Sequence, residues 1–138
     1  MLDLIEEALN EAGKTVGGSK IAILGVAYKP NIKDVQLTPV ERVIGKLKEM
    51  GARVEFYDPM FKGEELFGLK GRPTLEAAAK EADCLVIGTA HDEFKHLDIE
   101  ELSRLVRMRA ALVDGRNLVS PAEVRKVGFA FRGVGRRP

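Results

Sequence analysis

The stretch that decides the fold runs from Ile21 to Met50 and reads IAILGVAYKPNIKDVQLTPVERVIGKLKEM. Its first four residues, 21–24, are continuously apolar, which is typical of a strand covered on both faces of a parallel sheet. The loop that follows, 25–37, is longer than the roughly 2–6 residues that usually join a strand to a helix in such folds. Thr38 and Pro39 then supply the N-cap and the first-turn residue of an amphipathic helix. Open α/β sheets use this strand–loop–helix arrangement to bind anions and nucleotides.

Apolar strand-length runs alternate with helical patterns along the rest of the chain. We expect further strands at 54–57, 85–88, 111–113 and 129–131, and helices at 2–12, 74–82, 98–106 and 120–126. Residues 59–73, which are polar and rich in glycine, are expected to form a loop. This alternation predicts an α/β fold, a Rossmann-like three-layer sandwich with a mostly parallel sheet of about five strands. We divide the chain into an N-terminal helix and linker, 1–18, and a main domain, 19–138.

Composition limits the kind of protein. A net charge of +1 over 138 residues argues against general binding of nucleic acid or of an acidic membrane surface. No apolar run approaches the roughly 18 residues needed to span a bilayer. The single cysteine, Cys84, excludes an internal disulfide framework and fits a reducing compartment. We therefore expect a soluble, cytoplasmic protein that has neither nucleic acid nor membrane as a partner.

The main candidate ligand-binding residues lie where predicted strands end. The sequence G-x-G-x-x-G of ordinary dinucleotide sites is missing after the first strand, where Gly25 stands alone, so an ordinary primary NAD site is not expected. Lys29 in the long loop either contacts an anionic ligand or is a solvated lysine. Arg116, in the turn Asp114–Asn117, either grips a phosphate or carboxylate, or pairs with Asp114 or caps carbonyl groups.

The remaining polar candidates are weaker. Asp58 follows the second predicted strand, where it is a ribose-binding acid or, as we favour, part of a plain Asp-Pro strand stop. Cys84 is expected to be a small buried thiol rather than a nucleophile. His91 and His96 lack the spacing of a metal site or a catalytic triad, although contact of His91 with a ligand stays open. The sequence shows no metal cluster and no catalytic constellation of its own.

Four segments occur together and in order: the first-strand region, Tyr57–Pro59, Ala82-Asp83 with Thr89–Phe94, and Asp114–Asn117. In this combination the chain, from about residue 20 to residue 136, resembles the C-terminal, UDP-binding domain of the UDP-glucose/GDP-mannose dehydrogenase family. The resemblance implies enzymes that oxidise the C6 hydroxyl of a nucleotide sugar to a carboxylate with two NAD⁺. Residues 1–18 resemble the segment that joins this domain to a central dimerisation helix.

The family's catalytic residues belong to its N-terminal and central domains, and the resemblance places none in this chain. It therefore implies a nucleotide-sugar-binding domain or fragment of an NAD-dependent nucleotide-sugar 6-dehydrogenase, inactive alone. The alternative is a free-standing nucleotide-sugar-binding or docking subunit without oxidoreductase activity. The implied partners are a UDP-sugar or GDP-sugar and the other dehydrogenase domains, on the same or a separate chain, and a homodimer is compatible with the resemblance.

The resemblance also assigns residues. Tyr28 and Lys29 match the aromatic–lysine pair that contacts the nucleotide sugar, Asp34 matches an acidic position of the same loop, and Arg116 matches an arginine that reaches substrate. Gln36 stands where the family usually has an arginine on the NAD pyrophosphate, and an amide can hydrogen-bond but supplies no charge. NAD is thus implied for the full-length enzymes, and none is expected to bind tightly to this chain alone.

Overall fold

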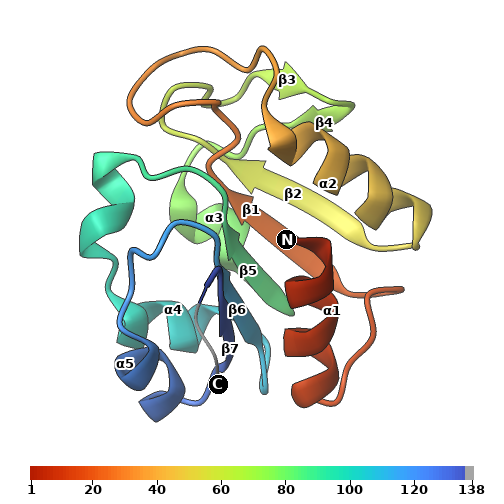
Figure 1. Cartoon of the computed structure of the whole chain (residues 1–138), viewed down its shortest axis with the longest axis vertical. Helices are drawn as coiled ribbons and strands as arrows, with labels where there is room; N and C mark the ends of the chain where they lie inside the picture. Colours follow the sequence, from red (N-terminus) through yellow and green to blue (C-terminus); the bar gives the residue numbers. More distant parts are fainter. Residues whose placement is uncertain (136–138) are drawn as a thin grey trace.

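The computed structural model describes residues 1–135, so residues 136–138 of the predicted domain 19–138 lie outside it. Its centre is a sheet of five strands in the order β2-β1-β5-β6-β7, and every neighbouring pair is parallel (Figure 1). The strands are β1 (Lys20–Leu24), β2 (Arg53–Tyr57), β5 (Cys84–Ile87), β6 (Ala111–Asp114) and β7 (Ala130–Gly133). The predicted Rossmann-like α/β sandwich with a mostly parallel sheet of about five strands is confirmed.

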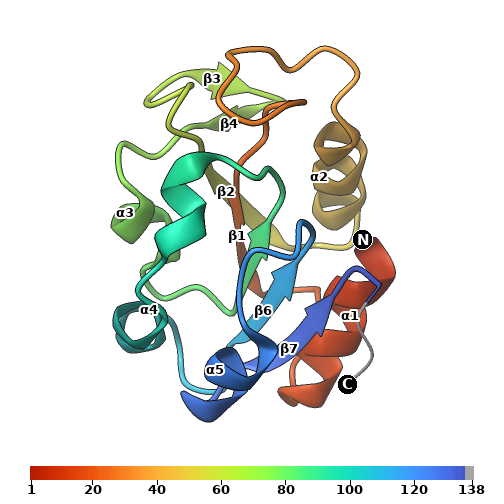
Figure 2. The same ribbon diagram turned by 60° about the vertical axis from the view of Figure 1, so that its left-hand side comes forward.

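Helices cover both faces of this sheet, as Figures 1 and 2 show. They are α1 (Leu2–Glu11), α2 (Pro39–Glu49), α3 (Leu75–Ala79), α4 (Ile99–Leu105) and α5 (Pro121–Lys126), with a 3₁₀ turn, η1, at Asp92–His96. Two apolar clusters separate the layers: α1 and α2 pack on one face, and α3, α4 and α5 pack on the other. None of these helices is long and apolar enough to cross a membrane within the described residues.

Strand β1 shows why its residues are continuously apolar. Ile21 and Ile23 point into the cluster under α1 and α2, whereas Ala22 and Leu24 point into the opposite cluster. All four are at most 1% exposed, because successive side chains of a strand alternate between two covered faces. The helix that follows begins as predicted, since the Thr38 hydroxyl accepts a hydrogen bond from the Val40 N–H.

The strand order creates a topological switch between β1 and β5. From β1 the chain passes through α2 to β2 on one side, and it later returns to place β5 on the other side of β1. The connections that leave the carboxyl ends of these two strands therefore diverge to opposite faces. Ligands of open α/β sheets bind in the crevice outside the carboxyl ends of the strands at such a point.

The prediction that residues 59–73 form only a loop is wrong for residues 65–70. Strands β3 (Glu65–Leu66) and β4 (Leu69–Lys70) form an antiparallel hairpin there. Its turn residues, Phe67 and Gly68, have φ of 56° and 75°, as the favoured two-residue hairpin turns require. Strands of two residues are too short to produce a visible alternation of apolar and polar side chains, so no pattern in the sequence predicts them.

Helix α1 is packed into the domain. Ile5, Ala8 and Leu9 are fully buried, and the helix lies against β6 and β7. Glu11 on the outer face of α1 contacts the Arg132 guanidinium at 2.6 Å. The apolar face of α1 is thus covered within this chain and is not available for docking. The division of the chain into residues 1–18 and residues 19–138 stays a prediction.

Candidate functional site

The loop after β1 carries four of the five predicted site residues. Tyr28 and Lys29 are exposed at its outer side, with the Lys29 Nζ 5.9 Å from the centroid of the Tyr28 ring. Asp34 stabilises the conformation of the loop through two hydrogen bonds. Its backbone carbonyl accepts from the Tyr28 N–H at 2.8 Å, and its carboxylate accepts from the Gln36 N–H at 2.9 Å. The four residues therefore share one surface segment, in which the Asp34 side chain is engaged with the backbone.

Two glycines allow the loops after β1 and β5 to touch. A Cβ atom on Gly88 would lie 2.5 Å from the Gly25 carbonyl oxygen. A Cβ atom on Gly25, which has φ of +95°, would lie 2.7 Å from the Thr89 Cβ. Only glycine fits either position without displacing backbone. The carboxyl ends of β1 and β5 are consequently in direct contact at the switch between them.

The Arg116 side chain, which comes from the turn after β6, bonds to Gly88 at this contact. Its Nε donates to the Gly88 carbonyl at 3.1 Å, while the buried Asp114 carboxylate accepts from the backbone N–H groups of Arg116, Leu118 and Val119 at 2.7–2.9 Å. Of the alternatives left open, the Arg116 side chain caps a carbonyl and does not pair with Asp114. Within residues 1–135 its two Nη groups donate no hydrogen bond, so a further acceptor can bind there.

Asp58 and His91 form a buried pair that the sequence did not reveal. Both residues are 0% exposed, and Asp58 Oδ2 lies 2.9 Å from His91 Nε2. The Asp58 carboxylate also accepts from the N–H groups of Val26, Ala27 and Met60. Burial opposes ionisation of this carboxyl, but the hydrogen bonds from His91 and the backbone prevail and hold the pKa of Asp58 below its ordinary value. Asp58 thus ends β2 with a local turn, as predicted, and its buried carboxylate in addition holds the loop after β1 and the His91 ring, so it is not exposed to bind a ribose.

A cleft of about 230 Å³ opens at the same edge of the sheet. Its walls are mainly apolar, with the Arg116 side chain as the charged member. The lining residues are Met1, Ile23, Pro39, Val40, Val43, Val86, Gly88, Gly115, Arg116 and Val134. A mostly apolar cleft with one fixed cation is the usual composition of a site for a small anionic ligand that also has an apolar part.

The family model described as "UDP-glucose/GDP-mannose dehydrogenase family, UDP binding domain" matches residues 22–121. This range contains Tyr28, Lys29, Asp34 and Arg116, and it covers more than half of the chain. The chain belongs to this family.

Individual relatives agree with this family. The UDP-glucose 6-dehydrogenase of Rhizobium meliloti (strain 1021) is 43% identical over 129 residues, which are 91% of this chain and 29% of that protein. A UDP-D-ManNAc dehydrogenase structure from Pyrococcus horikoshii has a TM-score of 0.82 at 33% identity, covering 97% of this chain and 29% of that one. An NDP-N-acetyl-D-galactosaminuronic acid dehydrogenase structure from Methanosarcina mazei Go1 has a TM-score of 0.88 at 30% identity, covering 95% and 27%. The chain thus spans less than a third of the length of these dehydrogenases.

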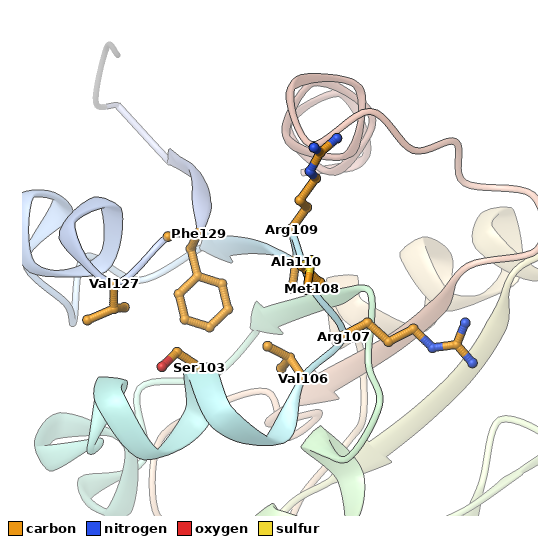
Figure 3. Close-up of a pocket in the computed structure, with 9 residues that line it drawn as sticks. Ser103, Val106, Arg107, Met108, Arg109, Ala110, Val127 and Phe129 are labelled. Atoms are coloured by element: carbon orange, nitrogen blue, oxygen red, sulfur yellow. The ribbon is translucent and has the colours of Figure 1, made fainter.

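Another hollow of this UDP binding domain, of about 310 Å³, lies at the opposite edge of the sheet (Figure 3). Its walls come from Ser103 of α4 and from the segments 106–110 and 127–129, which immediately precede β6 and β7. Figure 3 shows the Arg107 and Arg109 guanidinium groups diverging from each other and from the Phe129 ring. The cations therefore do not converge on a ligand, and the larger hollow is not the candidate site of the domain.

Cys84 and His96 lie outside the candidate site of this domain. Cys84 is fully buried in β5, as predicted, and burial raises the pKa of its thiol, so it is not a nucleophile. His96 is exposed at the end of η1. Among residues 1–135, no three histidine, cysteine or acidic residues are grouped so that they could hold a metal ion.

Proposed function

We propose that this domain binds the nucleotide of a UDP-sugar at the carboxyl edge of its sheet. The observation that carries the proposal is that two cations from distant segments lie on loops that leave the same edge of the sheet. Arg116, from the turn after β6, is bonded to the Gly88 carbonyl, and Gly88 touches the first residue of the loop that carries Lys29. An arginine with free Nη groups and an exposed lysine together neutralise the charge of a diphosphate.

The other members of the loop complete this role. The Tyr28 ring, 43% exposed beside the Lys29 ammonium, offers an aromatic face to the ligand. Asp34 acts through the loop conformation, because its carboxylate is bonded to the backbone of Gln36. The family and the relatives named for UDP-sugars support a uridine nucleotide over a guanosine one.

The domain belongs, in this proposal, to an NAD-dependent nucleotide-sugar 6-dehydrogenase whose catalytic residues lie outside this chain. Oxidation of a primary alcohol to a carboxylate removes two electron pairs as hydride, which two NAD⁺ accept in succession. The domain would contribute by holding the diphosphate and so orienting the sugar toward the catalytic groups. Gln36, exposed and uncharged, supports an NAD site that is held mainly by the rest of the enzyme.

Isothermal titration calorimetry of the chain with UDP, UDP-glucose, GDP-mannose and NAD⁺ tests the proposal. UDP and UDP-glucose are expected to bind more tightly than GDP-mannose and NAD⁺. Loss of a charge-assisted contact costs about 1.5–3 kcal/mol, so Lys29→Ala and Arg116→Ala are each expected to weaken UDP binding about 10-fold or more. Lys80→Ala is the matched control, since Lys80 lies at the opposite edge, where its carbonyl accepts from the Lys20 ammonium.

Two results would refute this function. One is that none of the four ligands binds at millimolar concentration. The other is that UDP affinity is unchanged in both Lys29→Ala and Arg116→Ala. Formation of NADH from UDP-glucose and NAD⁺ by this chain alone would separately refute the placement of catalysis outside it.

A further inference from the structure

Both ring nitrogens of His91 are used, and their partners fix the tautomer. Nδ1 lies 2.8 Å from the backbone nitrogen of Asn31, and Nε2 lies 2.9 Å from Asp58 Oδ2. A backbone N–H can only donate, so Nδ1 is the acceptor and the ring hydrogen sits on Nε2, which donates to Asp58. The histidine thus receives a hydrogen bond from one loop and gives one to another.

The segment 26–31 is held at both of its ends. At its start, the N–H groups of Val26 and Ala27 donate to Asp58, and the Ala27 carbonyl accepts from the Thr89 hydroxyl at 2.8 Å. At its end, the Asn31 N–H donates to His91. Tyr28 and Lys29 lie between these anchors with exposed side chains. Asn31 has φ of 61°, in the left-handed region that asparagine tolerates better than most residues, and its Oδ1 also accepts from the Asp92 N–H at 3.1 Å.

We propose that His91 is a positioning residue for nucleotide binding, which acts by accepting the Asn31 N–H and so presenting Tyr28 and Lys29 in one conformation. The inference rests on the proposed function, since it concerns the same site. A loop that is ordered before the ligand arrives does not lose conformational freedom on binding, and affinity is higher for that reason. The bond from His91 to Asp58 serves to hold the ring and keep its hydrogen on Nε2.

Two substitutions separate the two bonds of the ring. In His91→Asn the amide oxygen lies near the place of Nδ1 and can still accept from Asn31, while the donor to Asp58 is lost. In His91→Gln the amide nitrogen reaches the place of Nε2 and can still donate to Asp58, while the acceptor for Asn31 is lost. A histidine that served only to stabilise the fold would lose a buried hydrogen bond in either case, and the two variants would behave alike.

The test combines UDP titration, hydrogen exchange of the Asn31 amide by NMR, and thermal unfolding. We expect His91→Gln to weaken UDP binding about 10-fold and to accelerate Asn31 exchange about 10-fold or more, as a loss of ordering of this size implies. His91→Asn is expected to stay within about 3-fold of the wild type in both, although both variants melt at lower temperature. The same substitutions at the exposed His96 are the matched controls and leave all three measurements unchanged.

The outcomes separate this inference from the function on which it rests. If the wild type binds no UDP, the proposed function fails, while exchange of the Asn31 amide still tests the contact with His91. Equal loss of affinity in the two variants, or unaltered Asn31 exchange in His91→Gln, overturns the role of His91. One measurement needs only the wild-type protein. A long-range ¹⁵N–¹H spectrum that places the ring hydrogen of His91 on Nδ1 would also overturn the proposed role of His91.

Discussion

A single methyl group at Gly88 tests whether the contact between the loops after β1 and β5 is as close as described. In Gly88→Ala the new Cβ would lie 2.5 Å from the Gly25 carbonyl oxygen and 3.1 Å from the Val40 Cγ2. Relief requires a shift of backbone, and Gly25 is held by its N–H bond to the Tyr57 carbonyl at 2.8 Å. Overpacking usually costs about 1–3 kcal/mol, and a backbone neighbour places this case near 3. A domain of this size loses about 3–4 °C of Tm per kcal/mol, so a fall of about 10 °C is expected.

Gly45→Ala is the matched control for this substitution. Gly45 lies inside α2, and a Cβ atom there has nothing within 4 Å. Alanine in a helix interior is more stable than glycine by about 0.5–1 kcal/mol, so the Tm should rise by a few degrees. Urea unfolding followed by circular dichroism measures both variants, with unchanged m values expected. If Gly88→Ala melts no lower than the wild type, or shifts Tm in the same direction as Gly45→Ala, the close contact is wrong.

Three further predictions concern buried groups. Asp114→Asn removes an acceptor for N–H groups that hold the Arg116 turn; we expect a loss of about 2–3 kcal/mol in urea unfolding, and an unchanged midpoint would contradict it. Burial opposes ionisation of Asp83, but the Lys14 ammonium at 2.7 Å and a backbone N–H hold its pKa below the ordinary value. Its stabilisation is therefore present above the unfolded pKa near 4 and lost as pH falls through the folded value, so Asp83→Asn should flatten the stability curve between about pH 5 and 3. Cys84 should react with a thiol reagent only after unfolding, whereas rapid labelling of the native protein would contradict its burial.

The main layers of the fold could be predicted because each has a local signal. The four apolar residues of β1 indicate burial on both faces, and Thr38 with Pro39 marks the start of α2. The hairpin at residues 65–70 could not be predicted, because its strands contain two residues each. The packing of α1 was open for another reason: its amphipathic pattern predicts a helix but cannot name the surface that buries its apolar face.

The candidate site divides in the same way. The placement of Lys29 and Arg116 at one edge of the sheet could be predicted because residues that follow parallel strands meet there. The pairing of Asp58 with His91 could not, since they are 33 residues apart in the sequence and meet only because β2 and β5 flank β1. A signal existed in retrospect, an acid and a histidine directly after two strands, but its use requires the strand order. Contact with a ligand stays a prediction for all five residues, which are Tyr28, Lys29, Asp34, Gln36 and Arg116.

The cleft at the carboxyl edge draws its residues from segments between Met1 and Val134, so no contiguous piece of the chain holds the site. Under the proposed function, UDP would bind only to molecules of this protein in which β1, β5 and β6 are already paired. Ligand binding is then linked to the folding of the whole sheet, and a ligand at 100 times its Kd adds about 2.7 kcal/mol to the free energy of unfolding. A rise of Tm with UDP concentration would thus report that the sheet and its loops are correctly assembled. In a variant with a misplaced loop, the Tm would not change when UDP is added.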